Sequence, residues 1–150
     1  MANDQPDTAT ELRARALRLL ARREHSRQEI ARKLATRAES AAALNALLDS
    51  LESKKQLSDK RFACERARVL SRKYGAARIR QDLKAKGIER EIVDLVSGEE
   101  ELERARSILN RKYREPPTTR EERARRMRFL QSRGFSTEII VALLSARNAA

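Results

Sequence analysis

One short pattern occurs three times along the chain: two large aliphatic residues, any residue, an arginine and a second basic residue. Its copies lie at 19–23, 69–73 and 108–112. A second pattern consists of a glycine, an apolar residue, two variable positions, a glutamate and two aliphatic residues. It follows the second and third copies, at 87–93 and 134–140. Two patterns repeated in the same order indicate a duplicated unit, so we expect a tandem array and not a single core.

Each unit is predicted to contain three helices. Strand-like alternation of polar and apolar residues is nearly absent, and helix formers such as alanine, leucine and arginine dominate. Ser26 and Glu29 have the spacing of a capping box, as do Thr119 and Glu122, and the glycines fall where helices should end. The predicted helices are 9–24, 26–37 and 40–54 in the first unit, 58–73, 76–86 and 89–97 in the second, and 99–114, 119–133 and 136–147 in the third.

The composition favours several small cores over one deep core. Apolar residues make up 40% of the chain, but 23 residues are alanine, and tryptophan is absent. A unit of about 40–50 residues buries too little surface to be stable alone, so neighbouring units must support one another. We therefore predict an all-α fold, an elongated and curved array of three three-helix units. Its divisions are a flexible N-terminus at 1–10 and units at 11–57, 58–98 and 99–150.

The net charge indicates a polyanionic partner. The chain has 34 basic and 22 acidic residues, a net charge of +12, and arginine outnumbers lysine by 26 to 8. Arginine binds phosphate and carboxylate groups through paired hydrogen bonds, and the excess is spread over all three units. The alternative is a solvated helical surface on which these cations pair with nearby glutamates. The residues expected to contact a partner or a DNA backbone are Arg22, Arg23, Arg72, Lys73, Arg78, Arg80, Lys84, Arg111, Lys112, Arg125, Arg126 and Arg128.

Little in the sequence supports catalysis. The chain has one cysteine, Cys64, and one histidine, His25, so it can form neither an internal disulfide nor a cysteine-based metal site. Cys64 is expected to be half-buried by packing, and His25 to staple a helix start or to face solvent. A glycine-rich phosphate loop is absent from the sequence. We expect no enzymatic activity, no cofactor and no metal ion.

The sequence also bears on where the protein acts. Its longest apolar runs fall far short of the ~20 residues that cross a bilayer. Residues 1–10 are polar and acidic, unlike a signal peptide. These features predict a cytoplasmic protein that does not contact membranes, and we expect it to be a monomer.

Four segments carry a resemblance to a known family. They are 21–30 in unit one, 57–63 at the link into unit two, 78–83 with 86–88 in its middle, and 133–140 near the end. In this order they are similar to segments of the RecX regulatory proteins, and the resemblance covers roughly residues 12–147. RecX proteins are bacterial, cytoplasmic and built of tandem three-helix units. One departure is Glu24, which stands where units two and three have Tyr74 and Tyr113.

The resemblance implies a partner and an effect. It implies binding to the RecA recombinase, chiefly to its filament on DNA, and restraint of strand exchange, ATP hydrolysis and the co-protease activity behind the SOS response. It carries no catalytic residues. An alternative is a direct DNA- or RNA-binding protein of the helix-turn-helix type, since glycine turns join two short helices in units two and three. A third is a structural or ribosome-associated helical adaptor.

Overall fold

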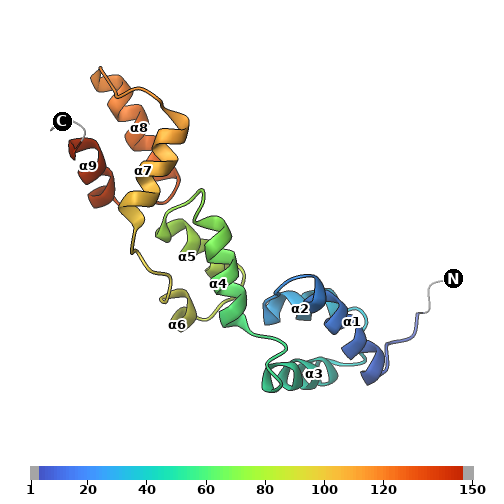
Figure 1. Ribbon diagram of the computed structural model, residues 1–150. Coiled ribbons are helices and arrows are strands. Elements are labelled where there is room, and N and C mark those ends of the chain that lie inside the picture. Colours follow the sequence, from blue (N-terminus) through green and yellow to red (C-terminus); the bar gives the residue numbers. More distant parts are fainter. Residues whose placement is uncertain (1–3, 147–150) are drawn as a thin grey trace.

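The computed structural model describes residues 4–146, which form nine helices and no strand. Figure 1 shows them as three successive triplets, and the most extensive helix packing falls within each triplet. This confirms the predicted all-helical array. The helices are α1 (Ala9–Arg22), α2 (Arg27–Leu34), α3 (Ala41–Ser53), α4 (Asp59–Leu70), α5 (Ala76–Ala85), α6 (Arg90–Val93), α7 (Glu101–Lys112), α8 (Arg120–Ser132) and α9 (Thr137–Ala146).

Side-chain caps fix where most of these helices begin. Ser26 accepts the amide of Glu29, and the Glu29 carboxylate accepts the amide of Ser26, so the predicted capping box at α2 is confirmed. The Thr119 hydroxyl accepts the amide of Glu122 at α8. The Glu122 carboxylate accepts a hydrogen bond from the amide of Thr118, the residue before the N-cap Thr119, so Thr118 also takes part in the cap.

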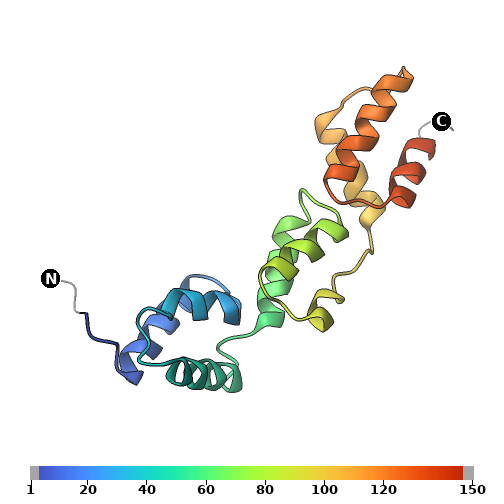
Figure 2. The same ribbon diagram turned by 180° about the vertical axis from the view of Figure 1, so that it is seen from behind.

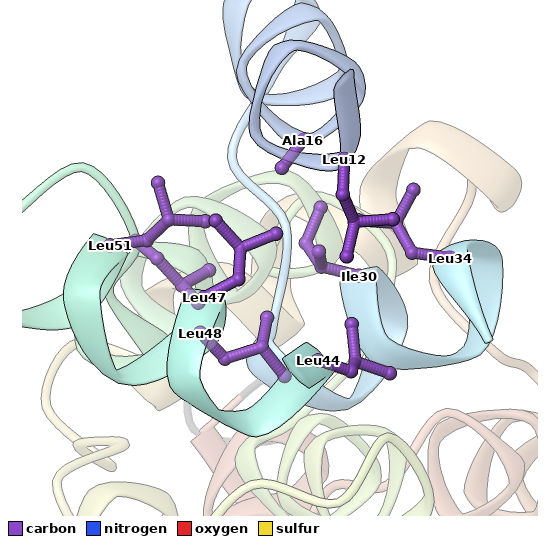
Figure 3. Packing of buried hydrophobic residues seen from close by; sticks show 9 residues of the cluster. Leu12, Ala16, Ile30, Leu34, Leu44, Leu47, Leu48 and Leu51 are labelled. Carbon is purple, nitrogen blue, oxygen red and sulfur yellow. The ribbon is translucent and has the colours of Figure 1, made fainter. Parts of the chain in front are cut away.

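Each triplet has its own hydrophobic core. In unit one the buried leucines and Ile30 of α1, α2 and α3 point toward one another (Figure 3). In unit two Phe62 packs with Ile79, Leu83 and Val93, and in unit three Leu109 and Leu130 pack with residues of α9. Each fully buried aliphatic side chain contributes about 1.5–3 kcal/mol, so a core of this size is modest. The predicted series of small cores is therefore present.

The molecule is elongated. The three triplets follow one another along its length, with the N-terminal and C-terminal parts at opposite ends in both views (Figures 1 and 2). Its accessible surface is 10218 Å², whereas a compact protein of 17.2 kDa would expose about 7800 Å². The excess area is what a row of small units leaves uncovered.

Two local expectations, the length of the helix at 89–97 and the burial of Cys64, differ from the structure. The helix expected at 89–97 is only the single turn α6, which ends at Val93. Beyond it, the Val96 carbonyl accepts a hydrogen bond from the Arg80 guanidinium, and the chain no longer follows a helix. Within the N-terminal segment, Asp7 is buried, donates its amide to the Arg37 carbonyl and pairs with Arg15. Cys64 is exposed and not half-buried. The predicted end of the last helix, at residue 147, lies outside the described residues.

Candidate partner-binding surface

Units two and three meet through two glycines. The amide of Gly75, between α4 and α5, donates to the carbonyl of Arg133 at 2.7 Å. A Cβ on Gly75 would lie 2.5 Å from the Gly134 carbonyl oxygen, and one on Gly134 would lie 2.4 Å from the Cβ of Arg78. Gly134 also has φ +89°, a conformation that glycine adopts without strain. Figure 1 shows these two turns facing each other. The backbones are therefore as close as glycine allows.

Side chains complete this joint. The buried carboxylate of Glu101, the first residue of α7, accepts the Ala76 amide at 2.7 Å and so caps α5, which has no cap of its own. Arg104 donates to the carbonyl of Tyr74. Arg78 donates to the carbonyl of Ser132. The Tyr74 ring lies between two guanidinium groups, 4.5 Å from that of Arg78 and 5.4 Å from that of Arg133. Tyr74 is therefore a residue of the joint between units two and three.

A shallow groove of about 300 Å³ follows this joint. Its lining is basic and contains no carboxylate; we call it the joint groove. The Arg111 guanidinium donates to the Arg72 carbonyl across the joint at 2.6 Å, and the Lys112 ammonium lies 4.2 Å from the centre of the Phe129 ring. The groove is lined by Arg72, Lys73, Ile108, Arg111, Lys112, Phe129 and Arg133.

The cations of the joint groove are not neutralised. Over the described residues 4–146, ion pairs join arginines and lysines elsewhere to carboxylates, and none involves the five basic residues of this groove. Aromatic faces and backbone carbonyls hold several of them in place and leave their charge uncompensated. Such a surface attracts an anion with little reorganisation.

The structure brings four predicted contact residues together here: Arg72, Lys73, Arg111 and Lys112. Arg133 joins them, and the sequence reasoning did not include it among the contact residues. It precedes the glycine of the second repeated pattern, and only the Gly75–Gly134 contact reveals that it lies beside unit two. That contact depends on the angle between units, which sequence spacing does not give.

The other predicted residues of units two and three are scattered. Arg125 and Arg128 are exposed on α8, and Lys84 is exposed on α5. Arg80 is committed to the Val96 carbonyl. Arg126 is only 6% exposed, with its guanidinium 4.5 Å from the Tyr113 ring centre, so it faces the interior of unit three and offers a partner almost no surface.

Unit one does not share the joint groove. Arg23 binds both oxygens of Glu29, and the resulting hydrogen bond lowers the pKa of that carboxyl. Glu24, at the position equivalent to Tyr74, pairs with Arg61 of unit two at 2.9 Å. Arg22 is exposed in a separate groove between α1 and α2.

Neither His25 nor Cys64 belongs to a reactive pair. The His25 ring bonds the Arg23 carbonyl through Nδ1 and approaches the Lys33 ammonium through Nε2, while Cys64 lies on α4 of unit two. Among residues 4–146, histidine, cysteine, aspartate and glutamate side chains do not gather in any group that could hold a metal ion. The helices in the same part of the chain are too short or too polar to span a bilayer.

Comparison with known proteins shows which family has this architecture. Three domain models match in sequence order: the first three-helix domain of RecX over residues 13–51, the second over 58–96 and the third over 99–144. The chain belongs to the RecX family. The regulatory protein RecX of Leptothrix cholodnii is 41% identical over 147 residues, covering 96% of this chain and 92% of the relative. That of Herbaspirillum seropedicae is 45% identical over 136 residues, covering 87% of each.

Solved RecX structures share the fold. The crystal structure of RecX from Lactobacillus salivarius superposes with a TM-score of 0.82 at 20% identity, over 95% of this chain and 97% of that one. A second RecX crystal structure gives a TM-score of 0.73 at 21% identity, over 91% and 74%. The RecX relatives are named as regulatory proteins, and this chain has the fold and the family of a regulator.

Proposed function

We propose that this protein is a non-enzymatic, cytoplasmic regulator that binds the RecA–DNA filament and restrains RecA. The observation that supports this most directly is the joint groove, where five uncompensated cations from two units are held together by a glycine contact. We infer that these cations contact anionic groups of the filament, as the nucleoprotein is itself highly charged. We place the unit boundaries near 57/58 and 98/99 and expect the protein to act as a monomer.

The elongated shape supports a filament as the target. A filament presents the same surface at regular intervals, and a row of linked units can contact several of these surfaces at once. Each contact raises the effective concentration of the next, so weak contacts add up to selective binding of the polymer over free subunits. RecX-family membership is consistent with RecA as the subunit of that polymer.

The alternative function is recognition of a nucleic-acid sequence by helix-turn-helix units, and the properties of α6 and α9 disfavour it. In the pairs joined by Gly87 and Gly134, the second helix would have to read base edges. α6 has only four residues. α9 has no basic residue between Thr137 and Ala146. We therefore favour contacts to a protein surface and a phosphate backbone over base recognition.

Charge reversal in the joint groove tests the proposal. We expect Arg72→Glu/Lys73→Glu/Lys112→Glu to raise the concentration that half-inhibits RecA ATP hydrolysis by about ten-fold or more. Three exposed contacts of about 0.5–1 kcal/mol each amount to that factor. Retention on RecA–single-stranded DNA–ATP filaments in a pull-down, compared with RecA alone, should fall in parallel.

A matched variant separates a local from a general charge effect. Arg32→Glu/Lys54→Glu/Lys60→Glu makes the same change in net charge at exposed residues outside the joint groove. It should inhibit RecA nearly as well as the unmodified chain. Equal inhibition by both triple variants, with folding intact by circular dichroism, would show that the joint groove is not the contact surface.

A further inference from the structure

Unit one has a second basic groove, separate from the joint groove. It runs between α1 and α2 and encloses about 500 Å³. Arg15, Arg18 and Arg22 line it from α1, and Lys33 and Arg37 line it from α2 and the turn after it. The remaining lining is Leu19, Ala21, Leu34 and Thr36, with neither a carboxylate nor an aromatic ring. We call it the α1–α2 groove.

Three of its cations are available to a ligand. Arg15 pairs with Asp7, and the Lys33 ammonium lies 3.1 Å from His25 Nε2 and 3.9 Å from a Glu29 oxygen. Between residues 4 and 146, by contrast, no side chain forms an ion pair or hydrogen bond with the guanidinium of Arg18, Arg22 or Arg37.

The arrangement of the cations selects the shape of the ligand. Arg15, Arg18 and Arg22 are three and four residues apart, so they share one face of α1 over about 10 Å. Cations on both walls of a groove fit a narrow strand that carries a charge on every repeat. An acidic protein helix is about 10–12 Å wide with its side chains and would need a flatter surface, and the apolar part of this lining is limited to Leu19, Ala21 and Leu34.

We propose that the α1–α2 groove binds the sugar–phosphate backbone of single-stranded nucleic acid. Arginine forms paired hydrogen bonds with phosphate, and the absence of an aromatic ring from the lining leaves no platform for stacking bases. Contacts to phosphate and sugar carry no sequence information, so binding through this groove is independent of base sequence. The site does not depend on the joint groove or on the proposed contact with RecA.

Neutralising two of the free arginines tests this site in the full chain without RecA. The probe is a fluorescein-labelled oligothymidylate of about 20 nucleotides, long enough to cover a typical site. We expect Arg18→Gln/Arg22→Gln to weaken binding about ten-fold near 0.15 M salt and to reduce the slope of log K against log salt by about 1.4. Both figures follow from the loss of two phosphate contacts to a single strand. Fluorescence anisotropy measures both quantities.

The control is Arg32→Gln/Lys54→Gln, which removes two exposed charges from unit one outside the groove. It should change affinity by less than about two-fold, and its salt slope should match that of the unmodified chain. An equal loss of affinity in both variants would show that the α1–α2 groove is not the binding site. The same conclusion would follow if polyglutamate displaced the labelled oligonucleotide as readily as unlabelled oligonucleotide does. Because RecA is absent, this result is independent of the RecA inhibition assay. If the joint-groove test failed, the proposal for the α1–α2 groove would be unaffected. If the oligonucleotide test failed, the proposal for the joint groove would likewise be unaffected.

Discussion

The ring of His25 is almost fully buried, 2% exposed, and it is fixed at both nitrogens. Its Nδ1 lies 3.0 Å from the Arg23 carbonyl oxygen, which can only accept, so Nδ1 carries the proton. Its Nε2 faces the Lys33 ammonium, which can only donate, so Nε2 is unprotonated. The sequence left open whether His25 staples a helix start or faces solvent, and the structure shows it buried. The contact with the lysine eight residues away indicates which ring nitrogen carries the proton, and the hydropathy pattern does not show that contact.

This environment predicts that the fold loses stability in mild acid. Burial lowers the pKa of His25 below its ordinary value of 6.5, and the Arg23 and Lys33 charges act in the same direction. The unfolded chain therefore takes up a proton first, and stability that is complete above pH 6.5 declines as the pH falls below that value. The free energy of unfolding, measured with urea, should decline between pH 6.5 and 5 by at most about 1.4 kcal/mol per pH unit.

Replacing the imidazole provides the control. His25→Gln should make the free energy of unfolding nearly independent of pH in this window. Glu29 and Asp82 also have lowered pKa values, from hydrogen bonds to Arg23 and Arg66, but they affect stability only below their ordinary values of 4.5 and 3.8. A pH dependence that persists unchanged in the variant would show that His25 is not its source.

At the scale of helices, the same joint occurs twice. The Asp59 carboxylate, at the start of α4, accepts the amide of Arg27 at 2.7 Å, just as Glu101, at the start of α7, accepts the amide of Ala76. In each case the first residue of the first helix of a new unit caps the second helix of the unit before it. Gly87 and Gly134 likewise lie against the second helix of the preceding unit, beside Gln28 and Arg78. The duplication visible in the sequence therefore extends to the contacts between units.

Removing the cap from the next unit should destabilise the protein. We expect Glu101→Ala to lower the free energy of unfolding by about 1–3 kcal/mol, because it leaves a buried amide without an acceptor. Asp59→Ala should cost about 0.5–1 kcal/mol, as its partner amide is only partly buried. Glu101→Gln keeps an oxygen in place and should recover much of the loss. Chemical denaturation ranks the three, and a Glu101→Ala variant as stable as the unmodified chain would refute the cap.

Helix boundaries were predictable where local signals decide them, and not where a distant side chain does. The apolar spacing and the Ser26 capping box locate α2 within a few residues. The helix predicted at 89–97 contains no breaker before Gly98, yet α6 ends at Val93. After α6, the amides of Leu95 and Val96 donate to the carbonyls of Ile92 and Val93 and so form tight turns. The Arg80 guanidinium donates to the Val96 carbonyl. The tertiary contact overrides the local preference of this segment.

At the scale of the whole molecule, the angle between units decides which cations act together. Arg22, Arg72 and Arg111 occupy equivalent positions of the repeated pattern, and all three are expected contact residues. In the fold, Arg111 bonds the Arg72 backbone across the joint between units two and three, while Arg22 lies in the α1–α2 groove. Charge density and periodicity are properties of the sequence, but the grouping of charges arises from how one unit sits on the next.

The angle between units two and three depends on the missing side chain of Gly75. We expect Gly75→Ala to separate these units, since its Cβ would lie 2.5 Å from the Gly134 oxygen, where 3.4 Å is the lower limit of ordinary contact. Gly98→Ala, in the link between the same units, has 3.7 Å of room and should leave them in place. Spin labels on exposed Cys64 and on a cysteine replacing Arg120 report the separation by pulsed electron resonance.

The two alanine variants should give different distance distributions. Gly75→Ala should shift or broaden the distribution, because a displacement of about 1 Å at the joint grows along α8, whereas Gly98→Ala should reproduce that of the unmodified chain. The joint groove contains residues from both units, so under the proposed function Gly75→Ala should also weaken inhibition of RecA with every groove cation still present. An unchanged distribution in Gly75→Ala would mean that something other than this glycine contact sets the relative position of units two and three.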